Sequence, residues 1–172
     1  TKSSNPKVAQ VVGRAKGELK KMEALGKPLE MKFTAVDGRE VDLSKMKGKV
    51  VLIDFWATWC KPCIKMMPKL QKLYEAYADT GLVVLGVSID DDKARIKKIK
   101  RFVKKVDVSY PIFSDAKEEP AWHMFNVKVL PAAFLIDPNG QIVAQWTGKI
   151  DHKQVEEEVA VRMAPQKKKK NL

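Results

Sequence analysis

Cysteine and histidine are scarce in this sequence, which has two of each among 172 residues. Two cysteines cannot build the framework of several disulfides that holds many small secreted domains together. A closed zinc site needs about four ligands, so we expect no metal site and two packed or solvated histidines, His123 and His152. No apolar run approaches the roughly 18 residues that a membrane-spanning helix requires.

Acidic residues are fewer than basic ones. The sequence has 21 aspartates and glutamates and 33 lysines and arginines, which gives a net charge of +12. Such a surplus can mark a nucleic-acid-binding protein. Here four lysines form the run Lys167–Lys170, and the others are spread along amphipathic segments. Aromatic residues do not interleave with the lysines, as a platform for stacking bases requires. We therefore expect a solvated basic surface and no nucleic-acid partner.

Both cysteines lie in one short stretch, where two patterns of hydrophobicity meet. Before Cys60, residues 49–55 contain the unbroken apolar run of a strand that is buried on both faces. After it, residues 61–79 place their apolar side chains at helical spacing. The first sulfur therefore lies at a helix N-terminus, where free N–H groups and the helix dipole stabilise a thiolate. This predicts thiol–disulfide exchange between Cys60 and Cys63, with a structural disulfide or half of a zinc site as alternatives.

The residues of this stretch have separate expected roles. We expect Cys60, the more exposed sulfur, to be the nucleophile, and Cys63, about one turn deeper, to resolve the mixed disulfide. Pro62 presets the backbone of the first helical turn, where its missing N–H costs nothing. Lys61 adds a positive charge that would lower the pKa of the Cys60 thiol. If this lysine points into water, screening makes that effect small.

One carboxylate interrupts the apolar strand before the cysteines. Asp54 lies between Ile53 and Phe55, and burial raises the pKa of a carboxyl because its charged form loses hydration. A carboxylate with a raised pKa near Cys63 can accept the proton of that thiol. The alternative is a structural acid whose oxygens are satisfied by hydrogen bonds.

The rest of the chain predicts one domain with additions at both ends. We expect an amphipathic helix or linker over residues 1–28, the domain over 29–163, and a basic disordered tail over 164–172. The domain would begin with a hairpin over 29–43 that turns in two residues at Asp37-Gly38. The patterns then predict strands at 82–89, 110–113, 132–137 and 141–147, and helices at 93–105, 118–125 and 151–163.

The segment that follows the second long strand carries three consecutive acids. We expect Asp90, Asp91 and Asp92 to cap the helix over 93–105, which would bury Ile96 among its inner side chains. The order strand, helix, strand implies a right-handed crossover and so a parallel pair of strands.

The order of these elements and the stretch FWATWCKPC resemble the thioredoxin fold, an α/β fold in which helices flank a central mixed sheet. With an N-terminal hairpin and a central helical insert before Pro131, the chain is similar to the TlpA/ResA-like thiol–disulfide oxidoreductases of bacteria over about residues 29–163. The other features that carry the resemblance are Asp54 six residues before the first cysteine, Pro68 five after the second, and Leu130-Pro131 before a strand.

The resemblance gives three further residues a role in substrate binding. Pro131 matches the cis-proline that faces the disulfide in this family, and an ordinary trans proline at a strand entry is the alternative. It would present the backbone of Leu130 for β-like pairing with an extended substrate. Trp59 would form part of the docking surface or, alternatively, pack in the core like Trp56.

The resemblance also implies the activity and its setting. It implies a protein-disulfide oxidoreductase that has no cofactor beyond the Cys60–Cys63 disulfide and acts on protein thiols and disulfides. We expect a monomeric reductase outside the cytoplasm, kept reduced by a membrane electron donor, with a cytoplasmic location as the alternative.

The chain departs from this group three residues after the second cysteine, where a glutamate is common and Met66 stands. This puts in doubt a specialised role in reducing haem-binding cysteines and leaves the exchange chemistry intact. We expect Met66 to pack rather than bind copper. Two other functions stay open. One is a thiol peroxidase, although Ala57 stands where the related peroxiredoxins carry threonine; the other is a non-enzymatic thioredoxin-like interaction module.

Overall fold

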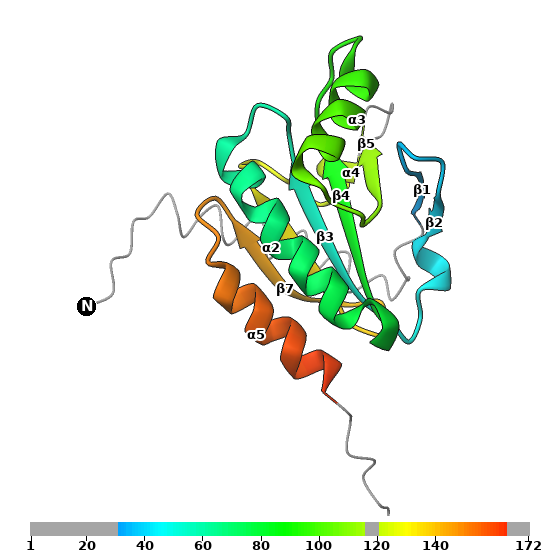
Figure 1. The fold of residues 1–172 in the computed structure, drawn as a ribbon. Coiled ribbons are helices and arrows are strands. Elements are labelled where there is room, and N and C mark those ends of the chain that lie inside the picture. Colours follow the sequence, from blue (N-terminus) through cyan, green and yellow to red (C-terminus); the bar gives the residue numbers. More distant parts are fainter. Residues whose placement is uncertain (1–30, 116–120, 165–172) are drawn as a thin grey trace, which may run out of the picture.

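The computed structural model of the protein describes residues 31–115 and 121–164 (Figure 1). The helix or linker predicted over residues 1–28 lies outside these ranges, as do residues 165–172 of the predicted tail and the start of the helix predicted over 118–125.

Five strands form the central sheet, in the order β5-β4-β3-β6-β7. These strands are β3 (Val50–Trp56), β4 (Leu82–Ser88), β5 (Ile112–Ser114), β6 (Ala132–Ile136) and β7 (Ile142–Thr147). The first three run parallel to one another, whereas β6 and β7 are antiparallel to their neighbours. The predicted mixed sheet is therefore confirmed, including the parallel pair formed by β3 and β4. All residues of β3 are buried because it is the central strand and both of its faces are covered.

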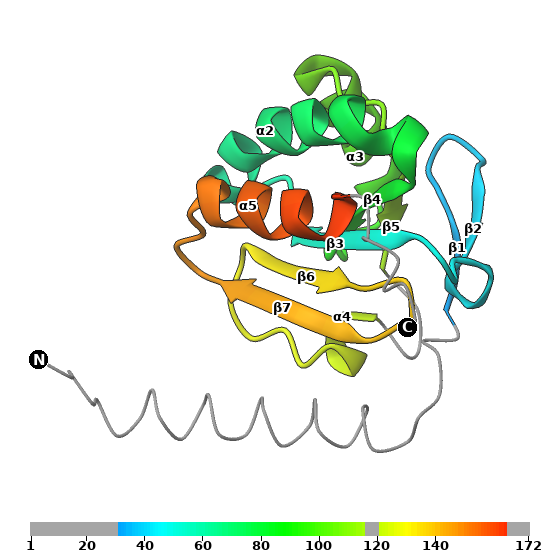
Figure 2. The ribbon, with the colours of Figure 1, turned by 90° about the horizontal axis from the view of Figure 1, so that it is seen from below.

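Helices cover both faces of the sheet (Figure 2). On one face lie α2 (Lys61–Tyr77), α3 (Arg95–Val106) and α5 (His152–Met163), and on the other lies α4 (Ala121–Met124). Two short 3-10 turns follow β2 and α2, namely η1 (Leu43–Lys45) and η2 (Ala78–Thr80). Along β3, Leu52 and Trp56 belong to the core on the α2 side, whereas Ile53 and Phe55 belong to the core on the α4 side. This alternation assigns Asp54 to the α2 side.

The N-terminal hairpin forms as predicted, but its turn differs. Strands β1 (Lys32–Thr34) and β2 (Glu40–Asp42) pair antiparallel and contribute apolar side chains to the core on the α4 side. The predicted two-residue turn at Asp37-Gly38 is wrong. The connection runs from Ala35 to Arg39, and Ala35 bonds to both Arg39 and Gly38 through its backbone. Gly38 has a φ of 93°, which suits the closing position of a longer turn.

The capping prediction for the helix after β4 is also wrong. The helix α3 begins at Arg95, and its N-cap residue Ala94 makes no side-chain capping bond. Asp92 instead accepts the backbone N–H of Ala94 in the turn before the helix. Ile96, predicted to face the core, is 41% exposed in the first turn of the helix, whereas Ile99 is fully buried.

Candidate redox site

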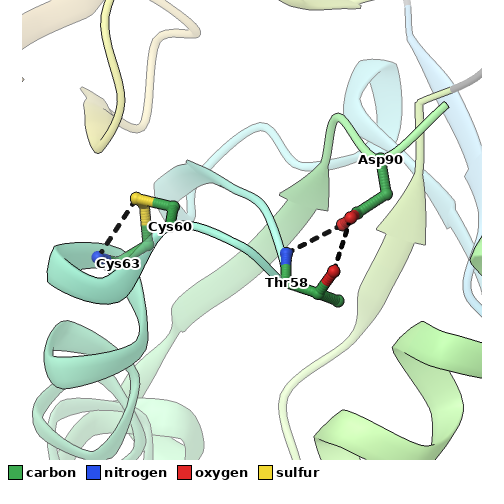
Figure 3. Close-up of a disulfide and its surroundings, with 4 residues drawn as sticks. All are labelled: Thr58, Cys60, Cys63 and Asp90. Carbon is green, nitrogen blue, oxygen red and sulfur yellow. Dashed lines mark hydrogen bonds between the residues drawn. A yellow bond between two sulfur atoms is a disulfide. The ribbon is translucent and has the colours of Figure 1, made fainter.

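The connection from β3 to α2 carries both cysteines. Cys60 is the N-cap residue of α2, and Cys63 lies in its first turn. Their sulfurs are bonded, with the two Cα atoms 5.3 Å apart. The Cys63 N–H donates to the Cys60 Sγ at 3.3 Å (Figure 3). Cys63 is fully buried, whereas Cys60 keeps a little exposure. Cys60 is therefore the cysteine that a partner can reach, and the Cys63 N–H of the helix is directed at its sulfur.

Asp54 is fully buried in the middle of β3. Neither of its carboxylate oxygens has a hydrogen-bond partner among the residues that the structure describes. Burial raises its pKa from 3.8 to about 7, because the charged form loses its hydration. The described contacts therefore do not make Asp54 a structural acid that is satisfied by hydrogen bonds.

Neighbouring side chains pack closely around this part of the sheet. The β4 residue paired in register with Asp54 is Gly86. A Cβ at Gly86 would lie 2.4 Å from Ile112 Cδ1 and 3.3 Å from Trp56 Nε1, so only glycine fits there without movement of its neighbours. Within the described ranges, the Trp56 Nε1 and the Tyr110 hydroxyl are likewise buried without partners. Burial, together with the charge of Asp54, raises the pKa of Tyr110.

Asp90, assigned from the sequence to helix capping, instead fixes the loop before Cys60. Its carboxylate accepts the Thr58 N–H at 2.9 Å and the Thr58 hydroxyl at 2.6 Å (Figure 3). It also accepts the Ser88 hydroxyl at 2.6 Å. The sequence did contain a signal for this role, namely an acidic residue directly after a buried strand. Because the carboxyl ends of adjacent parallel strands meet at one edge of the sheet, such a residue lies close to the loop that follows the neighbouring strand.

A surface groove of about 520 Å³ opens beside Cys60 and is lined by residues 59–62, 89, 122 and 127–130. Trp59 is 66% exposed at this groove, whereas Trp56 is fully buried, so the core-packing alternative applies to Trp56 alone. The Leu130–Pro131 peptide bond is cis, with Leu130 lining the groove and Pro131 buried behind it. Of the predicted docking residues, Trp59 and Leu130 thus line the same groove as Cys60.

The remaining candidate residues divide between surface and core. Lys61 and Pro62 are exposed at the start of α2. Met66 is buried in the core on the α2 side, where it packs. His123 is exposed beside the Trp122 ring, at 3.7 Å between ring centroids. The Nδ1 of His152, the other histidine, lies 2.9 Å from the Nζ of Lys69.

The described residues contain neither a cluster of metal-ligating side chains nor a helix suited to span a membrane. No three His, Cys, Asp or Glu side chains in residues 31–115 and 121–164 are grouped so that they could hold a metal ion. Over the same ranges, none of the helices has the length and apolar character needed to cross a membrane.

Comparisons with known proteins agree with this geometry. Residues 25–145 match the AhpC/TSA family. The chain is 37% identical over 123 residues to the thiol-disulfide oxidoreductase ResA of Bacillus cereus, which is 72% of this chain and 69% of that protein. It is 33% identical over 130 residues to the thioredoxin-like protein YneN of Bacillus subtilis, covering 76% of this chain and 75% of that protein.

Solved structures show the same fold. A Chlorobium tepidum protein assigned as thiol:disulfide interchange protein DsbE superposes with a TM-score of 0.71 and 29% identity. The superposition covers 80% of this chain and 95% of that one. The thioredoxin-like arrangement of a central mixed sheet, flanking helices and an N-terminal hairpin is therefore confirmed.

Proposed function

The chain belongs to the AhpC/TSA family, and from that premise we propose that it is a thiol–disulfide oxidoreductase that exchanges disulfides with protein substrates through Cys60 and Cys63. The observation that carries the proposal is the disulfide at the N-terminus of α2, with the reachable cysteine opening onto a groove. A disulfide that is only structural needs no groove, and the ResA relative is named as a thiol-disulfide oxidoreductase.

The exchange runs in two steps that move two electrons. In the reduced protein, the Cys60 thiolate attacks one sulfur of a substrate disulfide and releases the other sulfur as a thiolate. Cys63 then loses its proton and attacks the Cys60 sulfur, which releases the second substrate thiolate and forms the Cys60–Cys63 disulfide. The substrate is reduced to two thiols, and the cysteine pair is oxidised.

The first step needs Cys60 as a thiolate, and the start of α2 supplies the stabilisation. The Cys63 N–H already points at the Cys60 Sγ, and the positive end of the helix dipole favours negative charge there. We assign Pro62 the role of shaping this turn and Lys61 that of adding positive charge. Because Lys61 is exposed, water and salt limit its effect on the pKa of Cys60.

The second step needs a base for the Cys63 thiol, and we assign that role to Asp54. Its pKa of about 7 lets a substantial fraction be ionised near neutral pH while it still holds a proton well. Because no hydrogen bond from a described residue occupies its oxygens, they are free to accept a proton.

The docking of substrate rests on Trp59, Leu130 and Pro131. Trp59 offers an exposed aromatic face at the groove. The backbone of Leu130 bonds to no described residue, so it is available to pair with an extended segment. Pro131 holds that segment in place, since its carbonyl accepts the Gly148 N–H at 2.8 Å.

The proposal includes a direction and a setting. We place the protein outside the cytoplasm as a monomeric reductase. Disulfides form and persist in such oxidising compartments, so a reductase there needs a membrane donor that supplies its electrons. Thiol trapping in cells tests this arrangement. Loss of the donor should leave the Cys60–Cys63 pair oxidised, and a pair that stays reduced would contradict it.

Equilibration of the protein with glutathione and dithiothreitol tests the function itself. We expect a potential near about −270 mV and reduction of a model disulfide protein, whereas a value near about −120 mV would reverse the direction. A Cys63→Ser variant should accumulate the mixed disulfide, and Cys60→Ser should form none. A pair that fails to open and close with dithiols would overturn the exchange, and rapid turnover of hydrogen peroxide would favour the thiol peroxidase instead.

A further inference from the structure

The groove beside Cys60 combines apolar walls with charge of a single sign. Its only charged lining residues in the described part of the chain are Lys61 and Lys128, and they rise from different segments of the fold. Both are exposed, and neither forms an ion pair or side-chain hydrogen bond with any described residue. Two cations that have no partner among the described residues therefore line the groove that opens at Cys60.

The same groove leaves backbone and apolar surface uncovered. Residues 128–130 lie outside the strands, and their backbone groups bond to no described residue. Val129 in this segment is 55% exposed, and Trp59 faces the groove from the other segment. Unpaired backbone next to exposed apolar side chains fits an extended polypeptide, because such a segment can pair through its main chain and bury alternate side chains.

We propose that this groove selects polypeptide substrates in which acidic residues flank the reacting cysteine and an apolar residue lies beside it. The inference rests on the proposed function and adds the substrate class. Apolar walls alone would accept any extended segment, whereas the two lysines favour aspartate and glutamate and disfavour lysine and arginine. The net charge of +12 acts in the same direction, since it attracts acidic partners at a distance.

The test compares the rates at which the reduced protein cleaves three peptide disulfides. Each probe is a disulfide-linked dimer of a short peptide with one cysteine and one leucine beside it, and the flanking residues are glutamate, serine or lysine. At low salt we expect the glutamate probe to react at least about fivefold faster than the lysine probe, with serine between them. High salt should bring the three rates together, because exposed charges are screened.

Variants then separate the groove from the overall charge. Lys128→Ser should lower the ratio of the glutamate rate to the lysine rate, and Lys61→Ser with Lys128→Ser should bring it close to one. The ratio is the readout because any effect of Lys61 on Cys60 itself changes all three rates alike. The matched control is Lys47→Ser with Lys49→Ser, which removes two exposed lysines at the opposite end of β3 and should preserve most of the ratio.

Other results would contradict different parts of the proposal. Equal rates for the three probes in the unmodified protein would overturn the acidic preference and leave the exchange function standing. An equal fall of the ratio in the control pair would overturn the groove as its source, since net charge would then explain it. Failure to cleave any probe would count against the proposed function itself.

Discussion

Asp54 and Asp90 are both buried, one within β3 and the other just after the neighbouring strand β4, and their surroundings differ. Asp54 lies inside β3, is fully buried, and has no hydrogen-bond partner among the described residues. Asp90 follows the end of β4, is 3% exposed, and accepts three hydrogen bonds from Thr58 and Ser88.

The difference shows how surroundings assign a role to the same side chain. A buried carboxylate whose oxygens accept hydrogen bonds holds the donor groups in place, so Asp90 fixes the loop that leads to Cys60. A buried carboxylate without donors is unstable as an anion, so Asp54 takes up a proton more readily. Structural and catalytic roles should therefore separate when each residue is changed.

The largest expected effect is on the second step of exchange. Asp54→Asn removes the proposed base for Cys63, so resolution of the mixed disulfide should slow about 100-fold at neutral pH. First attack by Cys60 should stay within about twofold, since the groups at the start of α2 are unchanged. Rapid quenching with acid, followed by separation of the mixed disulfide, gives both rates. The matched change Asp90→Asn should leave resolution nearly intact, and equal slowing in both variants would remove the base role from Asp54.

The next effect is on the pH dependence of stability. The pKa of Asp54 rises from 3.8, its ordinary value, to about 7 in the folded protein. The folded state therefore binds the proton more tightly than the unfolded state does. Its contribution to the free energy of unfolding is therefore present at low pH and is lost as the pH rises through 7, by on the order of 4 kcal/mol. Urea unfolding of the oxidised protein from pH 4 to pH 8 should show Asp54→Asn gaining stability relative to the unmodified protein. A difference that is constant over this range would place the pKa of Asp54 near normal.

Replacing Asp90 should also change the free energy of unfolding, but by a smaller amount and in the opposite direction to Asp54→Asn. Asp90→Ala leaves the Thr58 N–H and two hydroxyl groups without their acceptor, which should lower the free energy of unfolding by about 3 kcal/mol. Urea unfolding at pH 7 measures it. The exposed neighbour Asp91 provides the control, since Asp91→Ala should change stability by less than about 0.5 kcal/mol. If Asp90→Ala is equally neutral, its hydrogen bonds do not hold the loop.

The smallest effect should come from the buried hydroxyl of Tyr110. Tyr110→Phe removes a polar atom that has no partner among the described residues, so stability should rise by less than about 1 kcal/mol or stay unchanged. Thermal unfolding measures the change, and Tyr74→Phe on the packed neighbouring ring is the control. A clear loss of stability, or slower resolution of the mixed disulfide, would show that the hydroxyl is bound and shares in the chemistry of Asp54.

The sequence by itself determined the order of the elements and the position of the redox pair. Cys60 and Cys63 could be placed because the change from an apolar run to helical spacing is a local signal. The burial of Asp54 followed from its place within that same run. The prediction of a two-residue turn at Asp37-Gly38 was wrong. The length of the loop in a hairpin depends on the register of the two strands, which a dipeptide does not determine.

Only the tertiary structure decided what surrounds these residues. Thr58 and Asp90 are 32 positions apart, and they meet because β3 and β4 are neighbours in the sheet. The groove exists because residues 59–62 and 127–130 come together beside the disulfide, and Trp59 is exposed at this groove. Hydrophobic periodicity tells which side of an element is buried, but it does not tell which distant side chains are packed against it. The sequence therefore could not predict that Asp90 is hydrogen-bonded while Asp54 has no hydrogen-bond partner among the described residues.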